Sequence, residues 1–291
     1  MTYNGARGDS GFHSDLGQAT SRSQATRRRV QELGEGYRTS LNSRQIVRQA
    51  ISPTISHIEP AAVGMFIGLD NTQPLPAFMP DCRNEDGVFA SVLARISDHY
   101  YSVHLPFTLA HEPQETRSYA ADKDTQLRIS DLIIYCLTMW RPGPGDGDPI
   151  RRTSAMGRHL RALGELPASD FDEVANVLMC SRVCATIESL ESLLIEDGYA
   201  PPHWAKDLMG RIEALRRLTD RPGFFVPVDL PEDSNGPPQR RAQRMVARYG
   251  ELLEWWPAIV ERTRDLGHRG VTIARCLNGS RATDRAPAQT R

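Results

Sequence analysis

The strongest structural signal in this chain is the segment from Ser169 to Gly198. Ser169 is suited to cap a helix N-terminus, and Asp172 and Glu173 follow in the first turn, where the helix dipole favours acidic residues. Apolar residues then recur at spacings of three and four, which places them on one helical face. We therefore predict a long amphipathic helix whose buried stripe, with both cysteines in the core, is Val174, Val177, Cys180, Cys184, Ile187, Leu190 and Leu194.

The rest of the pattern is also mostly helical. Residues 100–109 have the β-branched and aromatic content of a strand, which Pro106 restricts to an edge or a loop, so we expect at most a small hairpin there. Residues 58–69 fit a helix or a buried strand equally well. The other predicted helices span residues 24–33, 43–51, 86–96, 125–140, 156–163, 204–218 and 239–266, the last one kinked or interrupted at Pro257.

Composition divides the chain into a core and two arms. Residues 1–22 and 278–291 are polar and of low complexity, so they cannot bury enough apolar surface to offset the entropy of ordering. We expect disordered arms there and a mainly α-helical core over residues 23–277. The Pro/Gly-rich loop at 142–150 is a possible internal boundary, and residues 221–238 form an extended link.

Charge is distributed unevenly along the sequence. Lys123 and Lys206 are the only lysines among 35 basic residues, and the formal net charge is −1. Both ends carry more Arg than Asp and Glu, so the middle is strongly acidic. We expect this acidic body to repel polyanions from all surfaces except the arms, or to receive the basic arm of a neighbouring copy.

Three groups of arginines are the candidate binding residues. In the C-terminal group, Arg240, Arg244 and Arg248 are spaced i, i+4 and i+8, which aligns them on one helical face at steps of about 6 Å. Such a row suits the phosphates of a nucleic-acid strand, and binding of this kind is independent of sequence and weakened by salt. The complete groups are Arg22, Arg27, Arg28 and Arg29; Arg151, Arg152, Arg158 and Arg161; and Arg240, Arg241, Arg244 and Arg248.

Two questions stay open at this point. The same arginines would also suit the acidic surface of another protein, so a bacterial or phage adaptor, effector or regulatory protein is the competing hypothesis. Trp255, seven residues beyond Arg248, is placed to stack a base of a single strand, but Trp255 and Trp256 also suit core anchors. Binding of either kind requires guanidinium groups that are not engaged by carboxylates of the same chain.

Enzyme signatures are missing from the sequence. Neither lysine follows a Gly-rich loop, which excludes a P-loop, and the zinc-protease and zinc-deaminase spacings are also lacking. The five cysteines are spread widely, unlike those of a disulfide-stapled secreted domain. No run of 18 apolar residues and no N-terminal apolar signal segment is present. We therefore expect a non-enzymatic, cytoplasmic protein without a cofactor, a metal or a membrane span.

Pro, Ala and Ser make up 67 of the 291 residues, both ends are basic, and Arg replaces Lys almost entirely. In these respects the chain resembles the Pro/Ala/Ser-rich proteins of polymycoviruses, which coat double-stranded RNA genomes in place of a capsid. The resemblance implies a viral nucleoprotein with double-stranded RNA as its partner. Together with the charge pattern, it leads us to expect a self-associating protein, a homodimer or larger, that coats RNA by gripping its phosphates through the Arg clusters.

Overall fold

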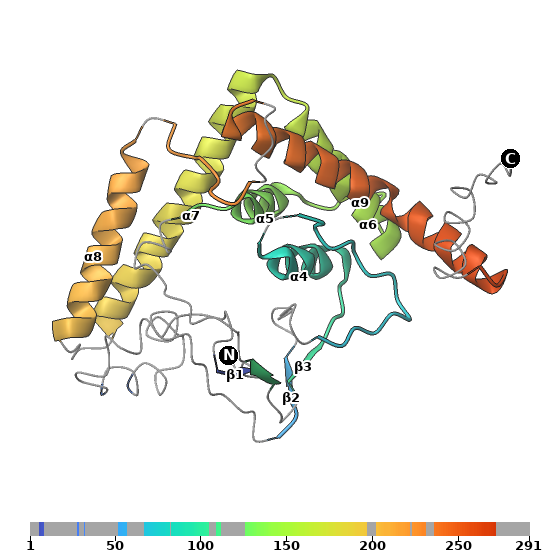
Figure 1. Ribbon diagram of the computed structural model, residues 1–291, viewed down its shortest axis with the longest axis horizontal. Coiled ribbons are helices and arrows are strands. Elements are labelled where there is room, and N and C mark those ends of the chain that lie inside the picture. Colours follow the sequence, from blue (N-terminus) through green and yellow to red (C-terminus); the bar gives the residue numbers. More distant parts are fainter. Residues whose placement is uncertain are drawn as a thin grey trace, which may run out of the picture.

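The protein is mainly helical, as the sequence predicted (Figure 1). The computed structural model describes residues 6–8, 28, 32, 52–56, 67–81, 83–104, 109–111, 126–196, 202–221, 223–230 and 236–271. The helices among them are α4 (Glu85–Ile96), α5 (Ile129–Met139), α6 (Pro149–Gly164), α7 (Ala168–Glu196), α8 (Pro202–Thr219) and α9 (Pro238–His268). The strands are β1 (Ala6–Gly8), β2 (Thr54–Ser56), β3 (Ser102–His104) and β4 (Leu109–His111).

Helix α5 lies at the centre of the core because its sequence is apolar on nearly every side. Ile129, Leu132, Ile133 and Leu137 are all fully buried. Residues 223–230, a described part of the predicted link, return to the start of this helix, where the Val228 amide donates to the Leu127 carbonyl over 3.0 Å. Helices α4, α6 and α7 pack directly against α5, whereas α9 packs mainly on α6 and α8 packs on α7. The apolar side chains of all six helices form one cluster. The loop at 142–150 therefore joins two helices, α5 and α6, that share one core.

Glycines bring helices α6 and α9 into close contact along their length (Figure 1). A Cβ at Gly157 would lie 2.3 Å from the Glu254 amide nitrogen, and one at Gly250 would lie 2.4 Å from the Arg161 nitrogen. Both opposing atoms belong to the backbone, so neither can move aside without shifting a helix. This contact fixes the rotation of α9 about its axis and therefore determines which of its side chains face outward.

The buried face of α7 coincides only in part with the predicted stripe: Leu190 is buried, and Val174, Ile187 and Leu194 are half-buried against the core. Val177 is 59% exposed and Cys184 is also exposed, so the prediction that Cys184 packs in the core was wrong, and Cys180 is only half-buried. The adjacent stripe is larger and includes an aromatic residue, and it packs against α5, α8 and α9. Its buried members are Phe171, Ala175, Leu178, Met179, Val183, Leu190 and Leu193. The helix starts at Ala168, so Ser169 lies within the first turn rather than at the cap.

The predicted strand is present at residues 102–104, but it does not form a hairpin with its neighbour in sequence. β3 pairs antiparallel with β2, and β4 pairs parallel with β1. The partners come from distant segments, because an extended segment can satisfy its backbone groups with any strand that approaches it. Residues 6–8 thus form a strand within the segment expected to be an N-terminal arm. The rest of residues 1–22, and residues 278–291, lie outside the described residues.

The remaining helix predictions hold with shifted ends. The predicted helix at 156–163 begins earlier, at Pro149, where Asp148 caps it by accepting from the Arg151 amide over 2.9 Å. Helix α9 continues through Pro257 without interruption. The predicted helices at 24–33 and 43–51 lie almost wholly outside the described residues. No helix in the described part of the chain has both the length and the apolar character needed to cross a membrane.

A candidate binding face on helix α9

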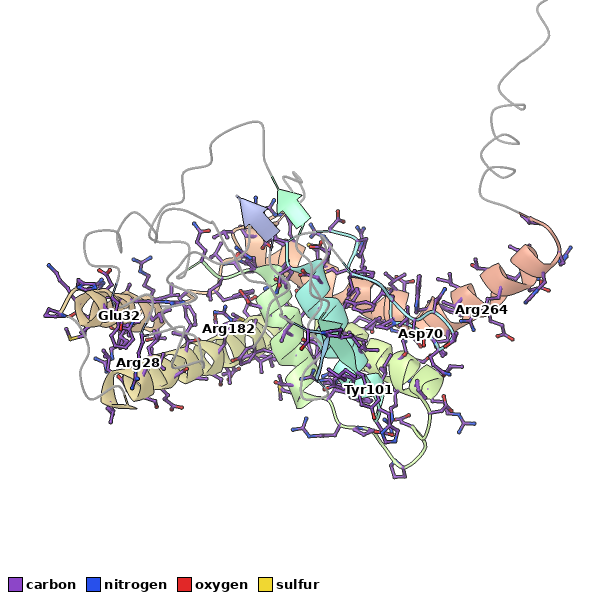
Figure 2. The ribbon with its side chains drawn as sticks, turned by 90° about the horizontal axis from the view of Figure 1, so that it is seen from below. Arg28, Glu32, Asp70, Tyr101, Arg182 and Arg264 are labelled. Atoms are coloured by element: carbon purple, nitrogen blue, oxygen red, sulfur yellow. The ribbon has the colours of Figure 1, made fainter. Side chains whose placement is uncertain are left out.

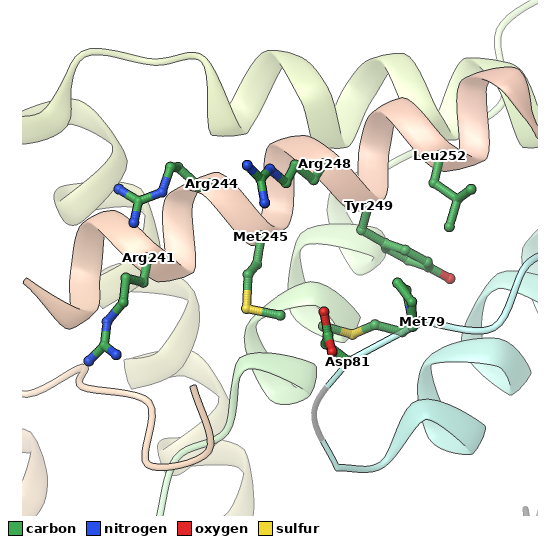
Figure 3. Close-up of a pocket in the computed structure, with 9 residues that line it drawn as sticks. Met79, Asp81, Arg241, Arg244, Met245, Arg248, Tyr249 and Leu252 are labelled. Carbon is green, nitrogen blue, oxygen red and sulfur yellow. The ribbon is translucent and has the colours of Figure 1, made fainter. Parts of the chain in front are cut away.

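A pocket of about 440 Å³ lies between helix α9 and residues 79–81 (Figure 3). The residues that α9 contributes are spaced so that they share one face of the helix. Three are cationic and three are apolar or aromatic: Arg241, Arg244, Arg248, Met245, Tyr249 and Leu252. Met79, Pro80 and Asp81 form the opposite wall. The pocket thus combines a largely apolar interior with three guanidinium groups on one side and a carboxylate on the other.

Hydrogen bonds hold the wall segment against α9. The Tyr249 hydroxyl donates to the Ala77 carbonyl over 3.0 Å, and the Trp256 indole donates to the Leu75 carbonyl over 2.7 Å. Tyr249 is 3% exposed, and this burial raises the pKa of its phenol. Farther along, Arg264 donates to the Asn71 carbonyl over 3.3 Å, at the projecting end of α9 (Figure 2). The segment therefore follows α9 from the pocket to this end.

The pocket face continues along α9 into exposed apolar residues. Leu252, Trp255 and Ile259 follow Arg248 at spacings of three and four, so all lie on the same side of the helix. Trp255 is 59% exposed and Ile259 is 42% exposed. Trp256, by contrast, is half-buried and hydrogen-bonded. The sequence left core packing open for both tryptophans and base stacking open for Trp255. Trp256 anchors the fold, whereas the ring of Trp255 is exposed.

Arg240 does not belong to the exposed row that the i, i+4, i+8 spacing predicted. It pairs with Asp172 of α7, donates to the Ala168 carbonyl over 3.1 Å, and lies over the Phe171 ring at 5.8 Å. Because α9 starts against the N-terminus of α7, this side chain is directed into the interface between the helices. Arg241 takes its place beside Arg244 and Arg248 at the pocket. Arg241 and Arg244 each also have an interaction partner within the chain, and Arg248 is exposed.

The predicted basic patch on α6 is largely neutralised within the molecule. Arg152 pairs with Asp98 over 2.7 Å, and Arg161 pairs with Glu254 over 2.7 Å. Arg151 forms a looser, exposed pair with Asp148 at 3.4 Å. Arg158 is exposed and has no carboxylate partner among the residues that the structure describes. Two of the four arginines therefore stabilise contacts between helices instead of forming a binding surface.

Arg28 is the one arginine of the N-terminal group that the structure describes, and it does not lie on the α9 face. Arg22, Arg27 and Arg29 lie outside the described residues. Arg28 is exposed and its carbonyl accepts from the Glu32 amide over 3.0 Å, a single helical turn. Figure 2 shows Arg28 and Glu32 at the end of the molecule where α7 and α8 pair, and Arg264 at the opposite end. Among the residues that the structure describes, the arginines of the candidate face therefore all come from α9.

Cys180 and Cys184 are the two thiols whose spacing on one helix could have suited a metal ion. Cys180 and Cys184 lie next to each other on α7, and desolvation together with the hydrogen bond and charge of Cys180 raises the pKa of Cys184. In the described ranges no three His, Cys, Asp or Glu side chains form a group that would hold a metal ion. The chemistry available on α9 is therefore binding of an anion next to apolar and aromatic surface.

No family model, curated protein or solved structure matched this chain. The residues of the pocket wall also had no signal in the sequence, because Met79, Pro80 and Asp81 are separated from α9 by more than 150 positions. Met245, Tyr249 and Leu252 were identifiable in principle, since they alternate with the arginines at helical spacing.

Proposed function

We propose that this chain is a non-enzymatic RNA-binding protein that holds a single strand along the exposed face of α9. The observation that carries the proposal is the open ring of Trp255 on the same helical face as Arg244 and Arg248. Guanidinium groups beside an aromatic platform are the combination that binds single strands without sequence preference. The rise of the helix places Arg241 about 20 Å from Trp255, a span of a few nucleotides.

The exposed aromatic ring favours a single strand over the duplex that the composition suggested. Bases in a duplex are stacked on one another, so their faces are closed to a side chain, whereas an unpaired base can stack on Trp255. The acidic residues elsewhere on the molecule support the same assignment, because they would repel a polyanion from the other surfaces. Self-association remains part of the proposal, and the mass of the protein in solution with and without RNA measures it.

The test measures how salt changes binding to a labelled single-stranded RNA of about a dozen nucleotides. Fluorescence anisotropy reports the binding. Three phosphate contacts give a slope of about −2 in log affinity against log salt, so affinity should fall roughly 20-fold between about 50 and 200 mM salt. Replacing Arg244 and Arg248 together (R244A/R248A) removes two contacts, and the slope should fall to about −0.7.

The matched control is R216A/R217A on α8, which removes the same charge from exposed arginines of another helix. This variant should keep the slope of the unmodified protein. If RNA does not bind at low salt, or if the two double variants lose affinity equally, the proposal is wrong. A partner protein with an acidic surface would then be the better hypothesis for the α9 face.

A further inference from the structure

We propose that the α9 pocket takes one unpaired nucleotide of the bound strand, with its base among the apolar side chains and its phosphate at Arg244 and Arg248. This inference rests on the proposed RNA-binding function and adds a subsite to it. In this arrangement the base in the pocket and a second base on Trp255 would be the two aromatic contacts of the strand. Both contacts require bases that are not paired.

The size and the lining of the pocket favour an aromatic guest. A volume of about 440 Å³ lies within the range of about 300–1,000 Å³ that is typical of small-ligand sites. Two methionines, Met79 and Met245, face each other across it (Figure 3). Methionine side chains adapt to a flat ring and their sulfur atoms make favourable contacts with aromatic groups. A bare phosphate would leave this apolar lining exposed to water.

The charges in the pocket favour a guest with different chemistry at its two ends. The guanidinium groups of α9 attract an anion, whereas Asp81 on the opposite wall repels one and accepts hydrogen bonds. A fatty acid gains from the first but, as a carboxylate, has no donor for the second. A nucleotide with an amino group on its base matches both, since a carboxylate accepts from the exocyclic amine of cytosine.

A duplex cannot offer a nucleotide to this pocket without breaking a base pair. Extruding a base costs unpairing and unstacking free energy, which an unpaired strand does not lose. The pocket therefore gives a physical reason for preferring single strands that is separate from the attraction of the arginines for phosphate. The arginines alone would bind the backbone of either form.

The experiment uses the full chain labelled with ¹³C at the methionine methyl groups, titrated with cytidine 5′-monophosphate. The methyl resonances of Met79 and Met245, assigned through Leu replacements, should shift in a saturable manner. Met139 and Met209 provide internal controls, because they are 57% and 50% exposed on other helices and should not shift. Inorganic phosphate at the same concentration should leave Met79 and Met245 unchanged.

Uridine 5′-monophosphate gives a matched comparison, since it carries a carbonyl oxygen where cytidine has the amine. The carboxylate of Asp81 should make the cytidine ligand bind roughly tenfold more tightly, and D81A should remove this difference. Absence of a shift at Met79 and Met245, or equal shifts with phosphate alone, would overturn the subsite. If labelled RNA still binds with the expected salt slope in that case, only the subsite fails. If the mononucleotide binds and RNA does not, the pocket is a site for free nucleotides, and both the RNA-binding function and the subsite for a bound strand fail.

Discussion

Trp255 and Trp256 show how far two adjacent residues can differ in role. The indole of Trp256 is half-buried and donates to Leu75, so it fastens the pocket wall to α9. The helix turns by about 100° per residue, which directs Trp255 away from that contact and leaves it 59% exposed. An indole ring in this position exposes apolar surface to water, and stacking on a base would cover that surface. Helical spacing singled out Trp255 as the residue that could stack a base, while core packing stayed open for both; the packing of α9 separates the two roles.

Replacing Trp255 with Ala should weaken RNA binding while leaving its salt dependence unchanged. Stacking of one base contributes about 1–3 kcal/mol, so affinity should fall roughly 5- to 150-fold. The same anisotropy titrations measure both quantities. V177A on α7 is the control, because Val177 is also 59% exposed and lies on another helix. A flattened salt slope in W255A would mean that the ring acts by positioning the arginines rather than by stacking.

At the scale of elements, the close contact between α6 and α9 determines the binding face. Gly157, Gly164 and Gly250 allow the two backbones to approach until an added methyl group at any of them would overlap main-chain atoms. Main-chain atoms cannot adopt a different rotamer, so the two helices have a single register. With α9 fixed in this way, Arg240 is directed to α7 and Arg241, Arg244 and Arg248 are directed to the pocket.

G250A should therefore destabilise the fold, although alanine favours helices more than glycine does. The new methyl group would lie 2.4 Å from the Arg161 nitrogen and 2.7 Å from the Gly157 oxygen, so the helices must separate at a cost of about 1–3 kcal/mol in unfolding free energy. G210A on α8 is the matched control, since no atom lies within 4 Å of its added Cβ. That variant should gain about 0.5–1 kcal/mol. Urea denaturation, monitored by circular dichroism, measures both changes. An equal effect of the two variants would contradict the role assigned to the contact between α6 and α9.

At the scale of the whole molecule, part of the uneven charge pattern of the sequence is neutralised inside a single chain. Asp172 in the acidic middle receives Arg240 from the basic C-terminal part, and Asp131 of α5 pairs with Arg182 of α7 over 3.0 Å. We expected the acidic body either to repel polyanions or to receive the arm of another copy, and at Arg240 the acidic partner lies in the same chain. The planar fork of arginine suits such contacts between helices better than lysine does, which gives the excess of Arg a structural use.

The buried thiol of Cys136 should make the folded protein less stable as the pH rises into the alkaline range. Cys136 is 1% exposed, and burial raises the pKa of its thiol to about 12. The thiol titrates near pH 8.5 when unfolded, so between these values the unfolded chain releases a proton that the folded chain retains. The unfolding free energy should consequently fall by about 1.4 kcal/mol per pH unit from this group, and not at all below about pH 8. C136A should show a shallower alkaline decline in urea denaturation, and parallel curves for the two proteins would contradict the prediction.

The sequence by itself determined the helical elements and the class of the fold. Helix positions follow from local signals, such as Pro149 at the start of α6 and the apolar repeat within α7, which act between residues close in the chain. Several helix ends were shifted by a few residues. The stripe predicted on α7 was right only in part, with Leu190 buried but Val177 and Cys184 exposed, because two adjacent apolar stripes compete and the partners of the helix select between them. The strand at Ser102–His104 was predictable as a strand, while its pairing with Thr54–Ser56 was not.

Only the tertiary structure decided which arginines line the pocket and which one pairs with another helix. Spacing placed Arg240 in the same row as Arg244 and Arg248, but a carboxylate 68 positions away in the sequence engages it. The pocket wall at Met79 and Asp81 likewise reaches α9 through hydrogen bonds to Tyr249 and Trp256. The physical reason is that secondary structure depends on contacts within a few residues, whereas pairing of charges and formation of a pocket depend on groups that come together only when the helices pack.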